Sequence, residues 1–350
     1  MRRGYAAAAG AQYAAVGRVG QVSDSLAATL TPQDAVNLLF SVLSPNLVEE
    51  GRKLKEGESQ LVHYTTAENA MQIIRSRTFW LRNVRCMNDY SEVRHGIDLL
   101  DKVFGGSENG RISRLYASLD QIAPGSARRA VDTFNTWIPR LPDITFIGCL
   151  SQAETNETIG RLSMWRAYSA PSTGVALILD KAPFVAETDA LKAYSLPVAY
   201  LTDDEFTEGI DRCLAALEGI VTSLHGVAPL VIEHTVFWWL LCMAVGLKHP
   251  AFDEEREWRV IYIPEMGKSE AIEQSVESVR GLPQIVQKIP LINNVGLGLH
   301  GAHPDNLLKH LIIGPTDFPF VLKEAFVALL EDADVKDAQE RVSVSFIPLR

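Results

Sequence analysis

The chain has 350 residues, of which 47% are hydrophobic and 22% are charged, and its formal net charge is -10. This composition is typical of a soluble globular protein with one large core or two smaller ones, and it excludes a fibre or a disordered chain. The acidic balance disfavours a broad basic surface that holds nucleic acid backbone, although a local basic groove is compatible with this total.

The four cysteines lie far apart in the sequence and form no CxxC pair: Cys86, Cys149, Cys213 and Cys242. The sequence therefore predicts neither a zinc site nor a disulfide framework. We expect a protein of the reducing cytoplasm that needs no metal.

Residues 1–55 are predicted to form an N-terminal extension with one helix and a linker. Apolar residues recur at helical spacing over residues 31–43, and Pro45 is interpreted as the stop of this helix. The segment 49–58 is charged and contains glycine, which favours a linker. A single domain is expected over residues 56–350.

Helical insertions are predicted within this domain at about 92–134 and 205–247, where apolar residues recur at helical spacing. The first insertion is expected to hold one helix over 92–103 and a longer one over 112–134. The most apolar window is 227–247, with two adjacent tryptophans at its centre. Glu233 lies inside it, so the uncharged run is shorter than the roughly 20 residues that span a membrane. The window is interpreted as a buried core helix, and no membrane contact is expected.

Short segments rich in β-branched and aromatic residues indicate strands between and after the helices. Together they predict an α+β fold with small, split, mainly antiparallel sheets at its centre and helices around them. The predicted strands are 61–64, 79–81, 144–151, 174–180, 198–201, 257–263, 311–315 and 342–347.

Polar side chains gather in clusters, three of them at the edges of predicted strands. A histidine at a strand end, with hydroxyls directly after it, suits a hydrogen-bonded small polar ligand. A carboxylate at the start of a later strand suits the stabilisation of developing positive charge. The candidate residues are His63, Tyr64, Thr65, Asn88, Asp89, Ser163, Trp165, Arg166, Tyr168, Glu257 and Arg259.

Each cluster also has a purely structural interpretation. His63 fits a core histidine whose ring is satisfied by a carbonyl group. Trp165 fits the core, with Ser163 near a helix N-terminus. The run 255–259 fits an ion-pair ladder on an exposed strand face, and Asn88 with its neighbour fits a simple turn. The sequence leaves both interpretations open.

Five short stretches of the chain carry a resemblance to a known family: His63 to Thr66, Asn88-Asp89 with Glu92, Ser163 to Tyr168, Glu255 to Arg259, and Ile313 to Pro315. In this order they resemble the bacterial family known as domain of unknown function 2971, from about residue 60 to the C-terminus. One departure is the stretch Asn-Asp-Tyr-Ser-Glu, where the family reads closer to Asn-Asp-Pro-Phe-Glu. Membership of that family implies no established activity.

A second resemblance is to the ADP-ribosyltransferase superfamily, whose members bind NAD in a cleft between two small sheets. It implies that His63, Tyr168 and Glu257 are catalytic: His63 on the adenine-side ribose, Tyr168 near the nicotinamide, and Glu257 on the nicotinamide ribose. Breaking the nicotinamide–ribose bond develops positive charge on the sugar, which a carboxylate stabilises. The residues expected to bind NAD are His63, Tyr64, Thr65, Asn88, Ser163, Trp165, Arg166 and Arg259.

Two functions of different classes follow. In the first, the protein is an NAD-dependent ADP-ribosyltransferase or NAD glycohydrolase, an effector in bacterial conflict or phage defence. In the second, it is a non-enzymatic module that binds a nucleotide or a protein in the same cleft. A nuclease is disfavoured, because no carboxylate cluster suited to two metals is evident. The sequence does not specify a protein or nucleic acid target.

Overall fold

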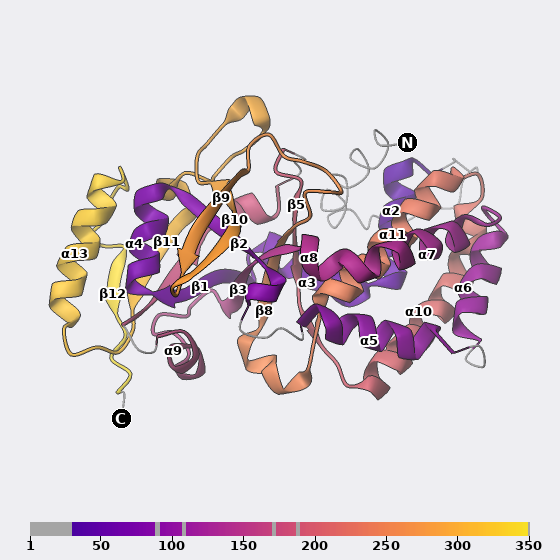
Figure 1. Cartoon of the computed structure of the whole chain (residues 1–350), viewed down its shortest axis with the longest axis horizontal. Helices are drawn as coiled ribbons and strands as arrows, with labels where there is room; N and C mark the ends of the chain where they lie inside the picture. The colour runs from indigo at the N-terminus through magenta and orange to yellow at the C-terminus, as the bar shows by residue number, and fades with distance from the viewer. Residues whose placement is uncertain (1–29, 88–91, 107–109, 170–172, 187–189, 349–350) are drawn as a thin grey trace.

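The computed structural model describes residues 30–348, apart from 88–91, 107–109, 170–172 and 187–189. A sheet with its covering helices forms one side of the molecule, and a layer of helices forms the other (Figure 1). Most strand pairs are antiparallel, and the sheet is open. The predicted α+β class is confirmed.

The described part of the chain contains a ten-stranded sheet and a separate pair of short parallel strands. The pair is β6 (Ala199–Tyr200) with β7 (Leu247–Lys248). The sheet contains β1 (Ser59–Thr66), β2 (Thr78–Asn83), β3 (Phe146–Glu154), β4 (Gly174–Leu179), β5 (Ala193–Pro197), β8 (Glu257–Tyr262), β9 (Glu273–Val279), β10 (Leu282–Pro290), β11 (Leu308–Ile313) and β12 (Val342–Val344).

The sheet forks at β3, because the two edges of this strand have different partners. One edge pairs with β8 over residues 146–151. The other edge pairs with β1 over 151–154 and with β2 at residues 146 and 147. The β1 limb continues through β4 and β11 to β12, and the β2 limb continues through β10 to β9. The split expected from the sequence is this fork within one connected sheet.

The pairing register fixes which side chains share a face of the sheet. Val62 pairs with Ser151, which pairs with Glu257 on its other side, so these three side chains lie on one face. We call it the Glu257 face. Successive residues of a strand point to opposite faces, so His63 lies on the other one, the His63 face.

Helices cover both faces of the sheet and also form the separate layer. α4 (Ala67–Ser76) and α13 (Pro319–Asp332) pack on the His63 face, and α9 (Leu162–Ser169) packs on the Glu257 face over β1 and β4. The layer contains α2 (Pro32–Leu43), α5 (Glu92–Phe104), α6 (Arg111–Asp120), α7 (Ser126–Trp137), α10 (Asp203–Ile220) and α11 (Pro229–Gly246). The remaining α-helices are α3 (Pro45–Glu56), α8 (Leu141–Ile144) and α12 (Pro304–Leu307).

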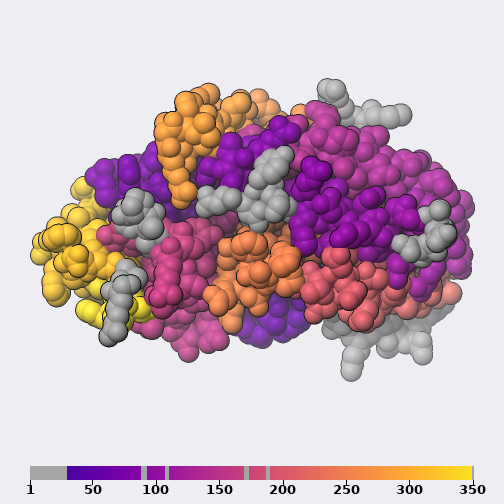
Figure 2. Space-filling model, turned by 60° about the horizontal axis from the view of Figure 1, so that its bottom comes forward, coloured from indigo at the N-terminus to yellow at the C-terminus, as the bar shows by residue number. Residues whose placement is uncertain are grey.

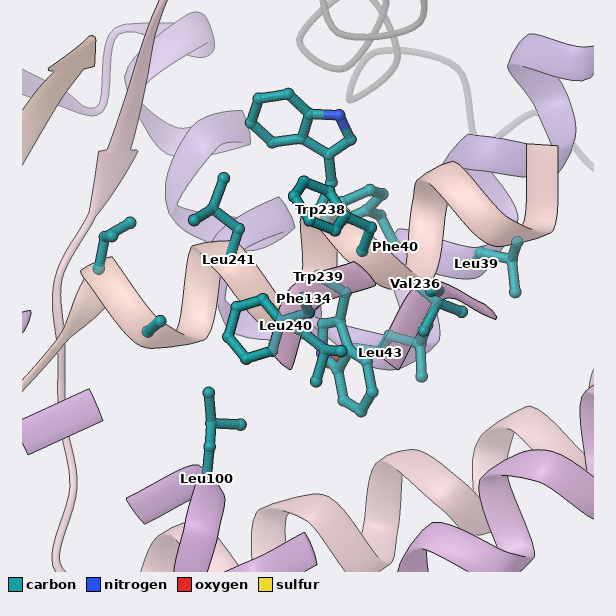
Figure 3. Packing of buried hydrophobic residues seen from close by; sticks show 14 of the residues in the cluster. Leu39, Phe40, Leu43, Leu100, Phe134, Val236, Trp238, Trp239, Leu240 and Leu241 are labelled. Carbon is teal, nitrogen blue, oxygen red and sulfur yellow. The ribbon is translucent and has the colours of Figure 1, made fainter. Parts of the chain in front are cut away.

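α11 is the central helix of the layer and contacts α2, α5 and α7. Its Trp239 is fully buried and donates from Nε1 to the carbonyl oxygen of Leu43 at 2.8 Å, so the indole N–H is satisfied. Figure 3 shows side chains of α2 gathered around those of α11. By length and composition α11 is the one described helix that could cross a membrane, but two thirds of it is buried in the protein. Such burial is typical of a core helix, as predicted.

α2, within the expected N-terminal extension, packs against α10 and α11 in the helical layer. Two details of the predicted architecture are wrong. Residues 45–56 form α3, so the linker expected over 49–58 is instead mostly helical and Pro45 begins a helix as well as following one. The single helix expected over 112–134 is two helices, with Gly125 at positive φ before the second.

Candidate functional site

A cavity of about 120 Å³ lies on the His63 face, near the fork of the sheet. Its walls come from β1, α4, β2, β4, β5, β8 and β10, with further residues from the segments that follow β4 and β10. Most of the lining is apolar, and the described lining residues include no lysine, arginine, aspartate or glutamate. The polar side chains in the wall include His63, Ser195 and His300.

β1 and β2 pair with opposite ends of the same edge of β3, and the cavity lies where these two strands diverge. Gly148 lies at this point, and a Cβ atom there would meet Phe79 Cε1 at 2.4 Å and Leu81 Cδ2 at 2.8 Å. Absence of a side chain therefore allows β2 to approach β3 closely. Phe79 then forms part of the cavity wall and contacts the His63 ring edge to face at 5.1 Å.

His63 is held by the backbone of β3. Its Nδ1 lies 3.0 Å from the carbonyl oxygen of Cys149. A carbonyl only accepts hydrogen bonds, so Nδ1 carries the hydrogen. Burial lowers the pKa of His63, and the bond to Cys149 only partly opposes this. The ring is therefore neutral near pH 7, and its Nε2 is a hydrogen-bond acceptor without a partner among the residues that the structure describes.

The structure corrects the predicted position of His63 at a strand end. Its contacts combine two features that the sequence left as alternatives, a bond to a carbonyl and a place in a cavity wall. His63 is the fifth of the eight residues of β1 and does not end the strand. The carbonyl expected to satisfy a core histidine is present, yet the same ring also lines a cavity. Thr65 shares the His63 face, but its hydroxyl accepts a hydrogen bond from Asn69 of α4 at 3.2 Å.

Glu257 belongs to a buried ion cluster on the opposite face. Its two carboxylate oxygens accept from Arg259 Nε at 2.9 Å and Nη2 at 3.1 Å, and Lys248 Nζ lies 3.3 Å away. Lys248 also donates to Glu255 at 2.7 Å. Burial opposes ionisation of Glu257, but Arg259 and Lys248 outweigh it and lower its pKa. The exposed ion-pair ladder expected here is wrong, because Glu257, Arg259 and Lys248 are all buried.

Tyr168 lies on α9 beside this cluster. Its pKa is raised, first by burial and then by the negative charges of Glu255 and Glu257. Tyr168 and Glu257 therefore lie on the same face of the sheet, and the charge of Glu257 acts on the Tyr168 hydroxyl. Neither oxygen of Glu257 is left without a partner.

The other predicted residues of α9 and β1 serve the core or the surface. Trp165 is buried and donates to the carbonyl of Ile159 at 3.1 Å, and Tyr64 is buried with its hydroxyl accepting from the backbone N–H of Arg161. Ser163 is half-buried and Arg166 is exposed. Trp165 thus fits the structural interpretation.

The cleft predicted to hold His63, Tyr168 and Glu257 together is not formed. His63 faces one side of the sheet, whereas Glu257 and Tyr168 lie on the other side, with β3 between them. Asn88 and Asp89 lie outside the described residues. Sequence reasoning also missed Ser195, whose hydroxyl accepts from Trp258 Nε1 at 2.7 Å, because β5 carries no clear strand pattern.

Comparison with known proteins adds one finding. No curated protein and no solved structure matches this chain. Residues 164–260, which run from α9 to β8 and include Tyr168, Glu257 and Arg259, match the family model described as "Protein of unknown function (DUF2971)". The likeness to this family thus covers residues 164–260, a shorter stretch than the expected one from about residue 60 to the C-terminus.

Proposed function

We propose that the protein binds a nucleotide by taking one of its heteroaromatic rings into the cavity on the His63 face. The observation that carries the proposal is the neutral His63 ring, fixed through Nδ1 and presenting Nε2 as an acceptor at a mostly apolar wall. An exocyclic amine or a carboxamide N–H₂ would donate to that nitrogen. Adenine and nicotinamide both carry such a group, so NAD is the first ligand to test.

The size and charge of the cavity limit which part of a nucleotide enters. Its volume of about 120 Å³ is close to that of engineered cavities of roughly 150 Å³ that take a benzene ring. The lining offers no lysine or arginine to phosphate groups. The ring therefore enters, and the ribose and phosphates stay at the mouth.

Binding is better supported than cleavage of NAD. A carboxylate that stabilises positive charge on a ribose must lie beside that ribose. Glu257 lies on the far side of the sheet from His63, and Arg259 and Lys248 occupy its oxygens. Of the two functions expected from the sequence, the non-enzymatic one is the proposal. We place this binding activity in the bacterial cytoplasm, on the resemblance to a bacterial family and on the four scattered cysteines.

The test measures thermal unfolding with millimolar NAD, ADP-ribose, adenosine, nicotinamide or ribose 5-phosphate. A ligand that binds only the folded chain raises the melting temperature, by about 1–3 °C when its concentration is some tenfold above Kd. We expect a rise with at least one ligand that carries a ring and no rise with ribose 5-phosphate.

A cavity-filling variant separates binding from folding. Ala193 lines the cavity, so Ala193→Leu should occupy the space of the ring, abolish the ligand-induced rise and leave the free protein folded. The control is Ala117→Leu, the same change at an exposed position of α6. The proposal is wrong if none of the ring ligands raises the melting temperature of the wild type, or if Ala193→Leu responds as the wild type does.

A further inference from the structure

Arg82 lies in β2 on the Glu257 face, away from the cavity. It pairs with Val286 of β10 on one side and with Ile147 of β3 on the other. Ile147 and Ser151 lie an even number of residues apart in β3, so they share a face, and Arg82 shares it with them. Figure 2 shows the orange segment that contains β9 and β10 beside the purple segment that contains β2. A ligand bound by Arg82 is therefore separate from a ring in the cavity.

The guanidinium group of Arg82 is held by two neutral acceptors. Its Nε donates to Gln284 Oε1 at 3.0 Å, and its Nη2 donates to the carbonyl oxygen of Cys86. Cys86 ends the short 3₁₀ helix Val84–Cys86, and Gln284 is buried on β10. Nη1 has no partner among the described residues, and it is not enclosed by protein. Its N–H groups are thus held in a fixed orientation at the surface.

No carboxylate of the described residues balances this charge. Among the described arginines that are buried or half-buried, Arg82 and Arg161 alone form no ion pair with a carboxylate. Arg161 lies over the ring of Tyr64, 6.0 Å from its centre, which is a favourable place for a guanidinium group. Arg82 has no such ring contact in the described part of the chain. The arginines that do form ion pairs are Arg52, Arg77, Arg111, Arg114, Arg259 and Arg341.

A second positive charge acts on Arg82. Burial lowers the pKa of its guanidinium group, and the positive charge of Arg280 lowers it further. Arg280 is exposed in the turn between β9 and β10, where its φ is 53°. Both side chains stay charged at neutral pH, because guanidinium groups are not deprotonated in proteins. Like charges at a partly desolvated place destabilise the fold, and a bound anion would offset that cost.

We propose that Arg82 and Arg280 bind an oxyanion, with a phosphate group as the first to test. A guanidinium group presents planar N–H donors in a fixed fork that matches the oxygens of phosphate and of carboxylate. Arg82 supplies the fixed donor, and Arg280 adds a second charge from the hairpin. The chain has a net charge of -10, so it does not attract anions in general, and binding has to come from these local charges.

Calorimetric titration of the full chain with inorganic phosphate, at constant ionic strength, tests the proposal. We expect one phosphate per chain at millimolar concentration. Arg280→Gln should weaken this binding by about tenfold or more, because a charge-assisted hydrogen bond contributes at least that factor. The control is Arg212→Gln, which removes the same charge from the helical layer, where the side chain of Arg212 is 71% exposed on α10.

A change at Arg82 tests the fixed donor. Arg82→Gln should abolish phosphate binding, but it also takes a donor from Gln284 and from the carbonyl of Cys86, so its melting temperature is measured alongside. Arg280→Gln tests the same site on an exposed turn, without that loss.

Titration with acetate distinguishes the two kinds of oxyanion. Binding of phosphate that exceeds binding of acetate supports the proposal, and acetate binding as tight as that of phosphate overturns the choice of phosphate. The site itself is overturned if the wild type binds neither anion. It is also overturned if Arg280→Gln or a folded Arg82→Gln binds as tightly as the wild type does.

Discussion

The stability of the folded protein depends strongly on the buried charge of Glu257. Glu257→Gln keeps the side-chain volume but removes the negative charge that faces Arg259 and Lys248 in the protein interior, and leaves Lys248 paired with Glu255 alone. Breaking a buried ion pair in this way costs about 3–5 kcal/mol. We expect urea unfolding to show a loss of that order. Glu218→Gln, which breaks an exposed pair with Arg114, is the control and should unfold almost as the wild type does. An unchanged stability for Glu257→Gln would contradict the structural role.

The same residue shows what sequence can and cannot give for a site. The order of His63, Tyr168 and Glu257 along the chain is visible in the sequence. The separation of His63 from Glu257 was not visible, because it depends on one residue of register at β1. A shift of one residue would move His63 to the other face. Strand periodicity alone does not determine that register.

At the scale of the elements, Gly148 is the residue that allows β2 to lie close to β3. Gly148→Ala would place a methyl group against Phe79 and Leu81, and such overpacking costs about 1–3 kcal/mol. Phe79 lines the cavity, so we also expect a smaller ligand-induced rise in melting temperature. The control is Gly219→Ala in α10, where a Cβ meets nothing within 4 Å and the helix should gain stability. Equal effects of the two changes would contradict this account.

Local patterns predicted most of the elements but not all of them. The α2 helix and the strands β1, β2, β4 and β8 follow from clear periodicity and caps. β9 and β10 were missed because their apolar residues, such as Val276 and Leu282, are exposed and form no core pattern. α3 was missed because Pro45 is equally compatible with the end of one helix and the first turn of the next.

For the whole molecule, buried histidines predict a loss of stability on acidification. Burial lowers the pKa of His63, His95, His234 and His310 below the value of an unfolded chain, about 6.5. Below pH 6.5 the unfolded chain therefore binds more protons than the folded one, so the free energy of unfolding falls as pH falls. His63 alone contributes up to about 1.4 kcal/mol per pH unit. Urea unfolding between pH 7.5 and 5.5 measures this slope.

A substitution of His63 measures how much of the pH dependence of the free energy of unfolding comes from the cavity histidine. His63→Leu removes the titrating group, so its stability should depend less steeply on pH, while the loss of the bond to Cys149 lowers stability at pH 7.5 by about 1–3 kcal/mol. His225→Leu is the control, since His225 is exposed on the surface. A slope that His63→Leu leaves unchanged would show that His63 is not held neutral.

The fork at β3 has a mechanical consequence. In the described part of the chain, the ladder of backbone hydrogen bonds joins the β1 limb to the β2 limb only through β3. A force that pulls the limbs apart therefore acts on few bonds near Cys149. The cavity wall includes Leu177 of the β1 limb and Ile289 of the β2 limb. A ring seated between them would act as a brace, so that the occupied protein resists shear between the two limbs more than the empty one does.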